Sequence, residues 1–476
     1  METRSRFRGF YQIMFLVLLG LGLGLSASLT AFSEESSGIP RLLTLQEVVF
    51  SAAEKNPSVL DALDVVEIAR SNLLLAREGE FDPVVTVSGN LALLGDLTSG
   101  GEISIKDTIP IAGLGKEPVA LERAEISLAQ AEQALSVTRQ EAIYQVMGAF
   151  FTVLRSERAL EAARLAEDIA RTTLIDTGIR FELGNASQQD LWQAEQNYLE
   201  AQGSTAQVWS GLLNHRKKLG LVSGLNLDEE VILQRDFTVR MDKPDRTVYL
   251  QYAQERHPTL FDLVFERERA DLSLEETLGE RRPKIGIFAS LVEDQWSLSL
   301  RTQNPEWDLD WEIQGRFYGD DSLSTAVDSF APSSNGWGAG IEVIWVPFDG
   351  GTGREQERQE RIKIEKIERS IQYQGSKVEI DIDGAIQAVF DAENRLFLSE
   401  LGLKIEEANS QARSQQLEQG FITDREYRQA AYQLTLAWMN HDIALTDLIL
   451  SRARLEQVSG RNIQLETILE TAVIAP

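Results

Sequence analysis

Cysteine is absent from the 476-residue chain, which excludes a disulfide framework, a thiolate metal site and a lipid anchor on an N-terminal cysteine. Positive charge is scarce, because 46 Lys and Arg residues stand against 74 Asp and Glu residues, a formal net charge of −28. Such a surface repels nucleic acid and attracts cations, so we expect no nucleic-acid partner. The negative charge fits either the solubility of a large hydrophilic surface or a charge-selective function.

Long apolar runs are also lacking. After the first thirty residues no run reaches eighteen apolar residues, so any entry into a membrane must use strands rather than helices. Residues 1–31 have the layout of a signal peptide for export, with three arginines, an apolar run at 13–25 and small residues after it. The run is shorter than the ~20 residues of a membrane-spanning helix, although an uncleaved anchor remains the alternative.

Proline is rare, with 12 residues in the chain, and this permits very long helices. After Pro118 at its start, the segment 117–181 contains no further proline and is rich in helix-forming residues, so we expect one helix of ~65 residues and about 100 Å. We expect the chain to turn at Gly184 and Gly420, with Asn185 and Thr423 available as N-caps. The helices predicted in this way span residues 45–80, 117–181, 187–219, 247–278, 354–419 and 423–455.

The chain contains two similar halves. Asn56 and Pro57 match His257 and Pro258, and each pair precedes a helix, a strand-like run and a long coiled-coil hairpin. We therefore divide the chain into a first repeat at 32–221, a linker at 222–246, a second repeat at 247–458 and a C-terminal tail at 459–476. The second repeat holds about 36 extra residues, roughly 293–335, which we expect to form an extracellular loop.

Four segments alternate apolar and polar residues, two within about 83–111 and the others at 284–292 and 337–348. Their length suits a tilted membrane strand, although an ordinary half-buried hairpin of a soluble domain is the alternative. We expect Trp337 and Trp345 in an aromatic girdle. The residues expected to face lipid are Val85, Val87, Ile103, Ile105, Ile341 and Val343. Because four strands cannot close a barrel, two, three or four copies must supply eight, twelve or sixteen strands.

Taken together, the paired openings at Asn56 and His257, the joint at 344–351 and the turns at 180–187 and 419–423 resemble the TolC-type outer-membrane efflux family. The resemblance covers nearly the whole mature chain. It implies a fold of an α-helical barrel plus a transmembrane β-barrel, closed as a homotrimer with twelve strands and a twelve-helix tunnel, with a mixed collar at its equator. It also implies an exit duct in the outer membrane, extending into the periplasm, that works with a periplasmic membrane-fusion adaptor and an inner-membrane transporter.

The hairpin turns are the candidate functional site, since they are the points farthest along the chain from the strands. The residues predicted for the turn and for adaptor docking are Gly184, Asn185, Ser187, Gly420, Phe421 and Thr423. Those predicted for the tunnel mouth are Asp190, Glu426, Gln193 and Gln429. A solvated helix face is the alternative for the two acids. Gln189, Gln193, Ile422 and Gln429 occupy places where polar or charged gate partners are expected, which argues against a charge-locked gate.

No motif indicates catalysis, a cofactor or a metal. The three histidines are scattered, and none has metal-ligand spacing with another histidine or a carboxylate. We therefore expect a passive exit duct of a tripartite efflux pump or a type I secretion system. The alternatives are a periplasmic coiled-coil adaptor or scaffold without a pore, for which the four strands would have no use, and an envelope hydrolase, for which a clustered nucleophile and base are missing.

Overall fold

The structure, a computed structural model, describes residues 42–77, 84–91, 99–109, 119–227, 231–293, 296–304, 308–317, 336–345 and 349–469. The predicted signal peptide, the first strand-to-helix joint at 110–118, residues 346–348 of the second joint and the end of the tail at 470–476 lie outside these ranges. Among the helices of these ranges, none combines the length and the apolar character that crossing a membrane requires.

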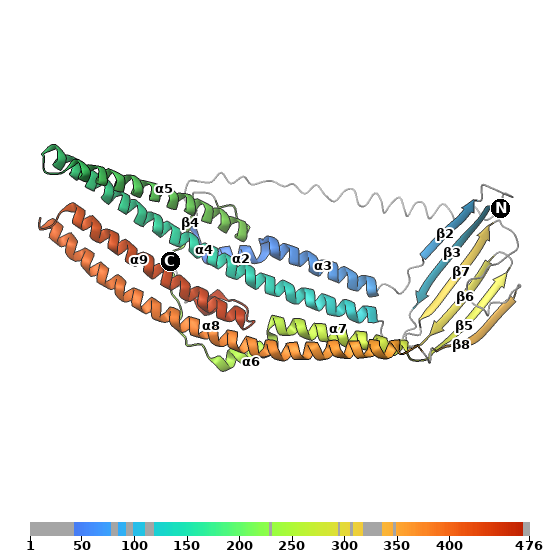
Figure 1. The fold of residues 1–476 in the computed structure, drawn as a ribbon. Helices are drawn as coiled ribbons and strands as arrows, with labels where there is room; N and C mark the ends of the chain where they lie inside the picture. Colours follow the sequence, from blue (N-terminus) through green and yellow to red (C-terminus); the bar gives the residue numbers. More distant parts are fainter. Residues whose placement is uncertain are drawn as a thin grey trace, which may run out of the picture. The chain divides into compact units, whose positions relative to one another are not determined.

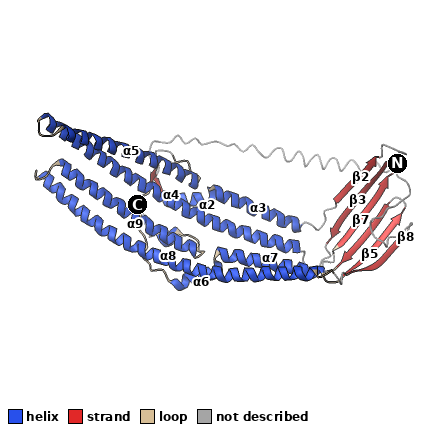
Figure 2. Ribbon diagram, in the orientation of Figure 1, coloured by secondary structure: helices blue, strands red, loops and turns tan. Residues whose placement is uncertain are grey.

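The helices form the same series twice (Figures 1 and 2). Each series has two short helices, then a helix of 64 or 67 residues, then a returning helix of 36 or 35 residues. The first series is α2 (Leu45–Lys55), α3 (Pro57–Arg77), α4 (Val119–Glu182) and α5 (Gln188–Ser223). The second is α6 (Arg246–Arg256), α7 (Pro258–Glu280), α8 (Thr352–Glu418) and α9 (Asp424–Val458), followed by the short α10 (Leu465–Ile468).

The predictions of single helices at 45–80 and 247–278 are wrong, because each breaks in front of a proline. Asn56 and His257 both have extended backbones, with φ/ψ of −62°/132° and −67°/127°. Proline sterically excludes the helical region for the residue before it, so the chain turns there and starts a new helix. Asn56 reinforces the break, since its Oδ1 accepts a hydrogen bond from Ser58 N at 2.9 Å.

A left-handed glycine follows each of the returning helices α5 and α9 and packs close to such a break. Gly224 and Gly460 have φ of 68° and 77°. A Cβ on Gly224 would lie 2.7 Å from Lys55 Cβ, and one on Gly460 would lie 2.9 Å from the Arg256 carbonyl oxygen. Both positions therefore require glycine for its backbone conformation and for the close approach.

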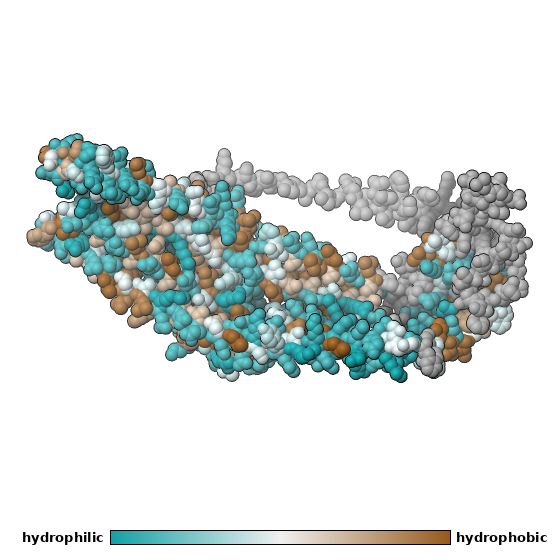
Figure 3. Space-filling view, viewed as in Figure 1, coloured by the Kyte–Doolittle hydropathy of each residue, from teal (hydrophilic) through white to brown (hydrophobic). Residues whose placement is uncertain are grey.

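The long helices pack through coiled-coil seams. Buried residues on α8 follow alternating spacings of four and three, the pattern of a heptad repeat. They are Val378, Ile382, Ala385, Val389, Ala392, Leu396 and Leu403. In the first series Val59 and Val66 of α3 pack with Leu135 and Ala142 of α4, again seven residues apart on each helix. Outside these seams the exposed helical surface mixes hydrophobic with hydrophilic residues (Figure 3).

Residues of the predicted linker pack on the first hairpin. Phe237 forms edge-to-face ring contacts with Phe150 and Phe151 of α4, at centroid distances of 6.2 and 5.5 Å. Strand β4 (Ile232–Leu233) pairs with β1 (Leu42–Leu43), and Gln234 N donates to the Leu43 carbonyl at 3.0 Å. This short sheet fits the mixed helix-and-strand collar that the family resemblance implies.

In the part of the chain that the structure describes, the larger sheet has six strands, so the prediction of four strands per chain is wrong. Figure 1 shows these strands side by side. The strands are β2 (Val84–Leu91), β3 (Ser99–Ile109), β5 (Lys284–Glu293), β6 (Trp296–Gln303), β7 (Leu309–Phe317) and β8 (Gly336–Ile344). Their spatial order is β2-β3-β7-β6-β5-β8, and every neighbouring pair is antiparallel. The prediction of a loop at 293–335 is therefore wrong for β6 and β7, while residues 318–335 lie outside the described ranges.

The residues of β6 and β7 alternate between apolar and polar side chains. β6 alternates Trp296, Leu298 and Leu300 with serines and Arg301, and β7 does the same with Leu309, Trp311 and Ile313 against acidic residues and Gln314. This period of two matches a sheet with one apolar and one polar face. Both strands therefore have the same pattern as the strands that surround them.

Candidate functional site

Two tight turns join the long helices to their returning helices. After α4, Gly184 takes a φ of 75°, Gly184 N donates to the Phe181 carbonyl at 2.9 Å and Asn185 N donates to the Arg180 carbonyl at 2.7 Å. After α8, Gly420 takes a φ of 73° and Phe421 N donates to the Gln416 carbonyl at 2.8 Å. In both turns a left-handed residue closes the helix, which favours glycine because it has no Cβ to clash.

The returning helices begin with capping boxes. Ser187 Oγ accepts from Asp190 N at 3.1 Å, while Asp190 Oδ2 accepts from Ser187 N at 2.8 Å. Thr423 Oγ1 accepts from Glu426 N at 3.3 Å, and Glu426 Oε2 accepts from Thr423 N at 2.8 Å. Thr423 is thus the N-cap that the sequence predicts.

Asn185 is not the N-cap of α5, so that prediction is wrong. Its backbone N–H belongs to the closing turn of α4, and the cap is Ser187, three residues after Gly184 just as Thr423 stands three residues after Gly420. The two turns therefore have the same construction, a left-handed glycine followed by a hydroxyl cap and an acid three residues further on.

Asp190 and Glu426 are held by their own turns. The pKa of Asp190 is lowered, first by the hydrogen bond from the Ser187 hydroxyl and then by the one from its backbone N–H. The pKa of Glu426 is lowered, first by the backbone N–H of Thr423 and then by its hydroxyl. Both carboxylates are therefore ionised and fixed in capping boxes. The capping role alone explains why acidic residues stand at these two positions, and a gate is not needed to explain them. Their role at a tunnel mouth stays a prediction.

The other predicted mouth residues lie on the exposed surface close to the turns. Gln193 donates from Nε2 to Asn197 Oδ1 at 3.0 Å along the same helix, and Gln429 is exposed. Bulky apolar side chains are exposed beside them, with Leu183 at 69% and Phe421 at 77% of their full accessible area. The turns thus present exposed apolar side chains next to fixed carboxylates.

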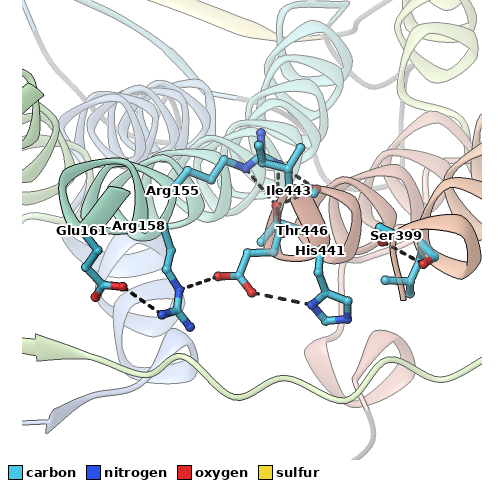
Figure 4. Close-up of polar contacts among 9 residues, drawn as sticks. Arg155, Arg158, Glu161, Ser399, His441, Ile443 and Thr446 are labelled. Carbon is cyan, nitrogen blue, oxygen red and sulfur yellow. Dashed lines mark hydrogen bonds and ion pairs between the residues drawn. The ribbon is translucent and has the colours of Figure 1, made fainter. Parts of the chain in front are cut away.

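An ion-pair network joins the two hairpins farther along, between α4 and α9 (Figure 4). Arg158 donates from Nε to Asp442 Oδ2 at 2.8 Å and from Nη1 to Glu161 Oε2 at 3.0 Å. Arg155 donates from Nη2 to Asp447 Oδ1 at 2.5 Å and also bonds Thr446. The pKa of Asp442 is lowered, because hydrogen bonds from His441 and Arg158 outweigh the burial that alone would raise it.

A further contact of this kind lies closer to the turns. Arg428 of α9 pairs with Asp168 of α4, and its Nε donates to Asp424 Oδ2 at 2.6 Å. Sequence reasoning missed Arg155, Arg158 and Arg428 altogether. The three-residue spacing of Arg155 and Arg158 places them on one helix face, but their partners are more than 280 residues away, and no local pattern identifies such partners.

The sheet positions predicted to face lipid share one side of the sheet by register. Val85 pairs with Ile105, Val87 with Ile103, Ile341 with Ile287 and Val343 with Ile285. Val85, Ile341 and Val343 are exposed at 59%, 74% and 63%, whereas the side chain of Val87 lies outside the described part. The structure thus groups these positions, and their contact with lipid stays a prediction.

The two predicted girdle tryptophans are exposed at 79% for Trp337 and 58% for Trp345. They stand eight residues apart, roughly 27 Å along an extended strand and about 19–22 Å along the barrel axis at a tilt of about 35–45°, slightly less than the ~25 Å height of a membrane barrel's apolar band. Trp296 lies at the same end of the sheet as Trp337, because Glu293 pairs with Trp296 and Leu291 with Trp337. The girdle itself stays a prediction.

The three histidines are apart from one another in the structure. His215 Nδ1 lies 2.6 Å from Ser156 Oγ, His441 Nδ1 lies 3.7 Å from Asp442 Oδ1, and burial lowers the pKa of His257 at the start of α7. Within the described ranges, no group of three or more His, Asp or Glu side chains is placed to hold a metal ion.

Comparison with known proteins agrees with this architecture. Residues 49–224 match the family described as outer membrane efflux protein. The chain is 23% identical over 322 residues to the outer membrane protein TolC of Vibrio cholerae, a match that covers 64% of this chain and 65% of that protein. The chain therefore spans slightly less than two thirds of that relative.

Solved structures extend the likeness to most of the chain. The Campylobacter jejuni CmeC outer membrane channel matches with a TM-score of 0.61 at 13% identity, over 90% of this chain and 86% of that one. The open state of the Neisseria gonorrhoeae MtrE outer membrane channel matches with a TM-score of 0.61 at 15% identity, over 90% and 91%. At these identities the structures establish the fold. With the family match at 49–224, they confirm the resemblance of this chain to the TolC-type outer-membrane efflux family.

Proposed function

We propose that this protein is the exit duct of a tripartite efflux pump or a type I secretion system, exported by its signal peptide and located in the outer membrane with its helices in the periplasm. The observation that carries the proposal is the fold, which resembles solved outer membrane channels over about 90% of the chain. The proposed activity is passive conduction, without catalysis, and its direction comes from an energised inner-membrane transporter.

The sheet supports membrane insertion over the alternative of an adaptor or scaffold without a pore. Its register gathers apolar residues on one side, including the pairs Ile287 with Ile341 and Ile285 with Val343. Many of these side chains are exposed in the single chain, and a contiguous exposed apolar surface needs lipid or a partner to cover it. A soluble adaptor would have to bury that surface elsewhere.

The proposed assembly is a homotrimer of two-repeat chains. An open sheet has two unpaired edges, which lipid does not tolerate, so several copies must close the wall. The helices support the same assembly, because α8 exposes Ile380, Phe397, Leu398, Leu401 and Ile405 outside its buried seam, at 51 to 69% of their full accessible area. Neighbouring copies would cover these side chains.

The hairpin turns are the proposed docking site of a periplasmic adaptor. Leu183 and Phe421 supply exposed apolar anchors, and the Schellman turns hold them in fixed positions. Ala186→Trp and Phe421→Asp are expected to remove the adaptor that copurifies from solubilised membranes, while the oligomer keeps its mass. Unchanged copurification with both variants would contradict docking at the turns.

Location and orientation can be tested with single cysteines, because the natural chain has none. Helix α7 leads into β5 at Lys284, so the opposite end of β5, at Glu293, lies at the end of the strand away from the helices. We expect a membrane-impermeant maleimide to label Glu293→Cys in intact cells, but to label Ala186→Cys only after the outer membrane is opened. Equal labelling of both sites in intact cells, or labelling of neither before opening, would contradict the proposal.

A further inference from the structure

The hairpin of β6 and β7 lies in the middle of the sheet. β7 is hydrogen-bonded to β3 on one side and to β6 on the other, and β6 is bonded to β5. One row of opposite residues crosses all six strands in the order Val85, Ile105, Ile313, Leu298, Leu291 and Trp337. An unbroken apolar row through this hairpin makes it part of the same wall as its neighbours.

The opposite face of the hairpin is polar and continues the polar face of the neighbouring strands. Lys106 of β3 stands opposite Glu312 of β7, and Asp310 of β7 stands opposite Arg301 of β6. Arg301 also forms an ion pair with Glu342 of β8, at 3.5 Å between Nη2 and Oε2. Charged side chains are costly on the lipid side of a barrel and normal on the lumen side, so this face suits a water-filled lumen.

The two edge strands lack the devices that protect exposed edges. β2 and β8 contain no proline, and their only charged residue is Glu342. Soluble proteins guard such edges with lysine, proline or bulges, and lipid does not tolerate them at all. The occupant that fits both edges is a second copy of this chain, with β8 of one copy beside β2 of the next.

We propose that the closed barrel has eighteen strands, six from each chain of a trimer, instead of the twelve implied by the family resemblance. This inference rests on the proposed outer-membrane trimer and extends it to the width of the pore. Barrel diameter grows roughly linearly with strand number, so the barrel is about one and a half times as wide as a twelve-stranded one at equal tilt. Barrels of this size enclose an aqueous channel, which suits bulky hydrophilic solutes.

Engineered disulfides in the cysteine-free chain test the six-stranded sheet directly. Ile105 and Ile313 are opposite residues, whose Cα atoms in an antiparallel pair stand about 4.5–5.5 Å apart, within disulfide range. Ile105 and Leu291 lie three strand spacings apart, roughly 14 Å, which is too far. If the hairpin stood outside the wall as a loop, Ile105 and Ile313 would not be opposite residues, and the first pair would be out of range.

We expect the Ile105→Cys/Ile313→Cys variant to form its disulfide in membranes, detected by mass spectrometry of the linked peptides, and Ile105→Cys/Leu291→Cys to form none. A disulfide in the second variant, or in neither, would overturn the six-stranded wall. Native mass spectrometry of the same protein then counts the copies in the assembly. A dimer or monomer would overturn the eighteen-stranded barrel but leave the six-stranded sheet of each chain standing. Failure of the proposed function appears separately, as absence of the protein from the outer membrane.

Discussion

At the scale of single residues, the hairpin turns depend on two hydroxyl groups. The hydroxyls of Ser187 and Thr423 each accept a hydrogen bond from the backbone N–H three residues on. In return, the carboxylates of Asp190 and Glu426 accept from the backbone N–H of Ser187 and Thr423. A lost N-cap costs ~0.5–2 kcal/mol of local helix stability. The start of each returning helix, which borders the proposed docking surface, is therefore stabilised in part by one hydroxyl side chain.

Ser187→Ala is expected to speed amide hydrogen exchange at Asp190 by roughly 2- to 30-fold, the factor that corresponds to about 0.5–2 kcal/mol. The reason is that Asp190 N loses its acceptor. Exchange followed by mass spectrometry of peptides covering the turn measures the effect, with Gln188→Ala as the matched control. Equal exchange in wild type and Ser187→Ala would show that the capping box does not hold the turn.

The same turns are expected to loosen in acid. Because the folded-state pKa values of Asp190 and Glu426 are lowered from 3.8 and 4.5, the carboxylates stabilise the turns above those ordinary values and lose that effect as pH falls through the lowered ones. The difference in hydrogen exchange of the turn peptides between wild type and Asp190→Asn/Glu426→Gln should be largest at pH 6 and shrink as the pH falls below 3.8. A difference that persists unchanged in acid would contradict the assignment.

At the scale of elements, the sequence predicted the long helices but only four of the six strands in the larger sheet. Residues 119–182 contain no proline, and their two glycines, Gly148 and Gly178, are tolerated inside a helix. The helix breaks at Asn56 and His257 were also indicated in the sequence, by the prolines at the next position, but each segment was predicted as one helix. Strands β6 and β7 were not predicted, because residues 293–335 have no counterpart in the first repeat and were interpreted as a loop. Trp296 to Arg301 nevertheless alternate between apolar and polar residues as clearly as the other strands do.

The capping glycine turns at Gly184 and Gly420 followed from the sequence because glycine there satisfies a local need. The inter-hairpin ion pairs did not, because Arg158 meets Asp442 only after two hairpins separated by more than 280 residues have packed. A local pattern can identify a turn, while a tertiary pair depends on the register of whole helices.

The Arg158 to Asp442 pair gives an element-scale prediction about the coupling of the hairpins. Both side chains are partly exposed, at 26% and 29%, so we expect solvent to limit their coupling to about 1 kcal/mol. A double-mutant cycle of Arg158→Ala and Asp442→Ala on the free energy of unfolding measures it. The surface pair Arg358 and Glu355, at 3.9 Å and mostly exposed, is the control and should show a coupling near zero. Equal coupling in both pairs would contradict a role for the network between hairpins.

The two faces of the sheet are tested by neighbouring residues of β3. Ile105 lies in the apolar row and Ser104 on the polar side. Arginine on the lipid side near the membrane centre costs about 2–4 kcal/mol, and little on the lumen side. Ile105→Arg should therefore lower the yield of folded, heat-resistant oligomer in the membrane, and Ser104→Arg should leave it near wild type. Equal loss with both variants would mean that the register is wrong.

At the scale of the whole molecule, the proposed assembly closes the sheet wall and the helical tunnel with several copies of the chain. The described part of each chain contains a six-stranded sheet, with β2 and β8 at its edges, and two long hairpins with exposed apolar side chains. We expect light scattering in detergent to give the mass of a trimer. A monomer that keeps its sheet in detergent would contradict the proposal that several copies close the barrel.

The central claim is that the closed assembly is a water-filled pore, and single-channel recording of the purified protein in a planar bilayer tests it most directly. We expect stepwise current increases of uniform size that vanish in the Ile105→Arg variant, because that variant fails to build the wall. We also expect a preference for cations, from the chain's excess of 74 acidic over 46 basic residues. Protein that inserts into membranes as a trimer but never carries ionic current would contradict the proposed duct.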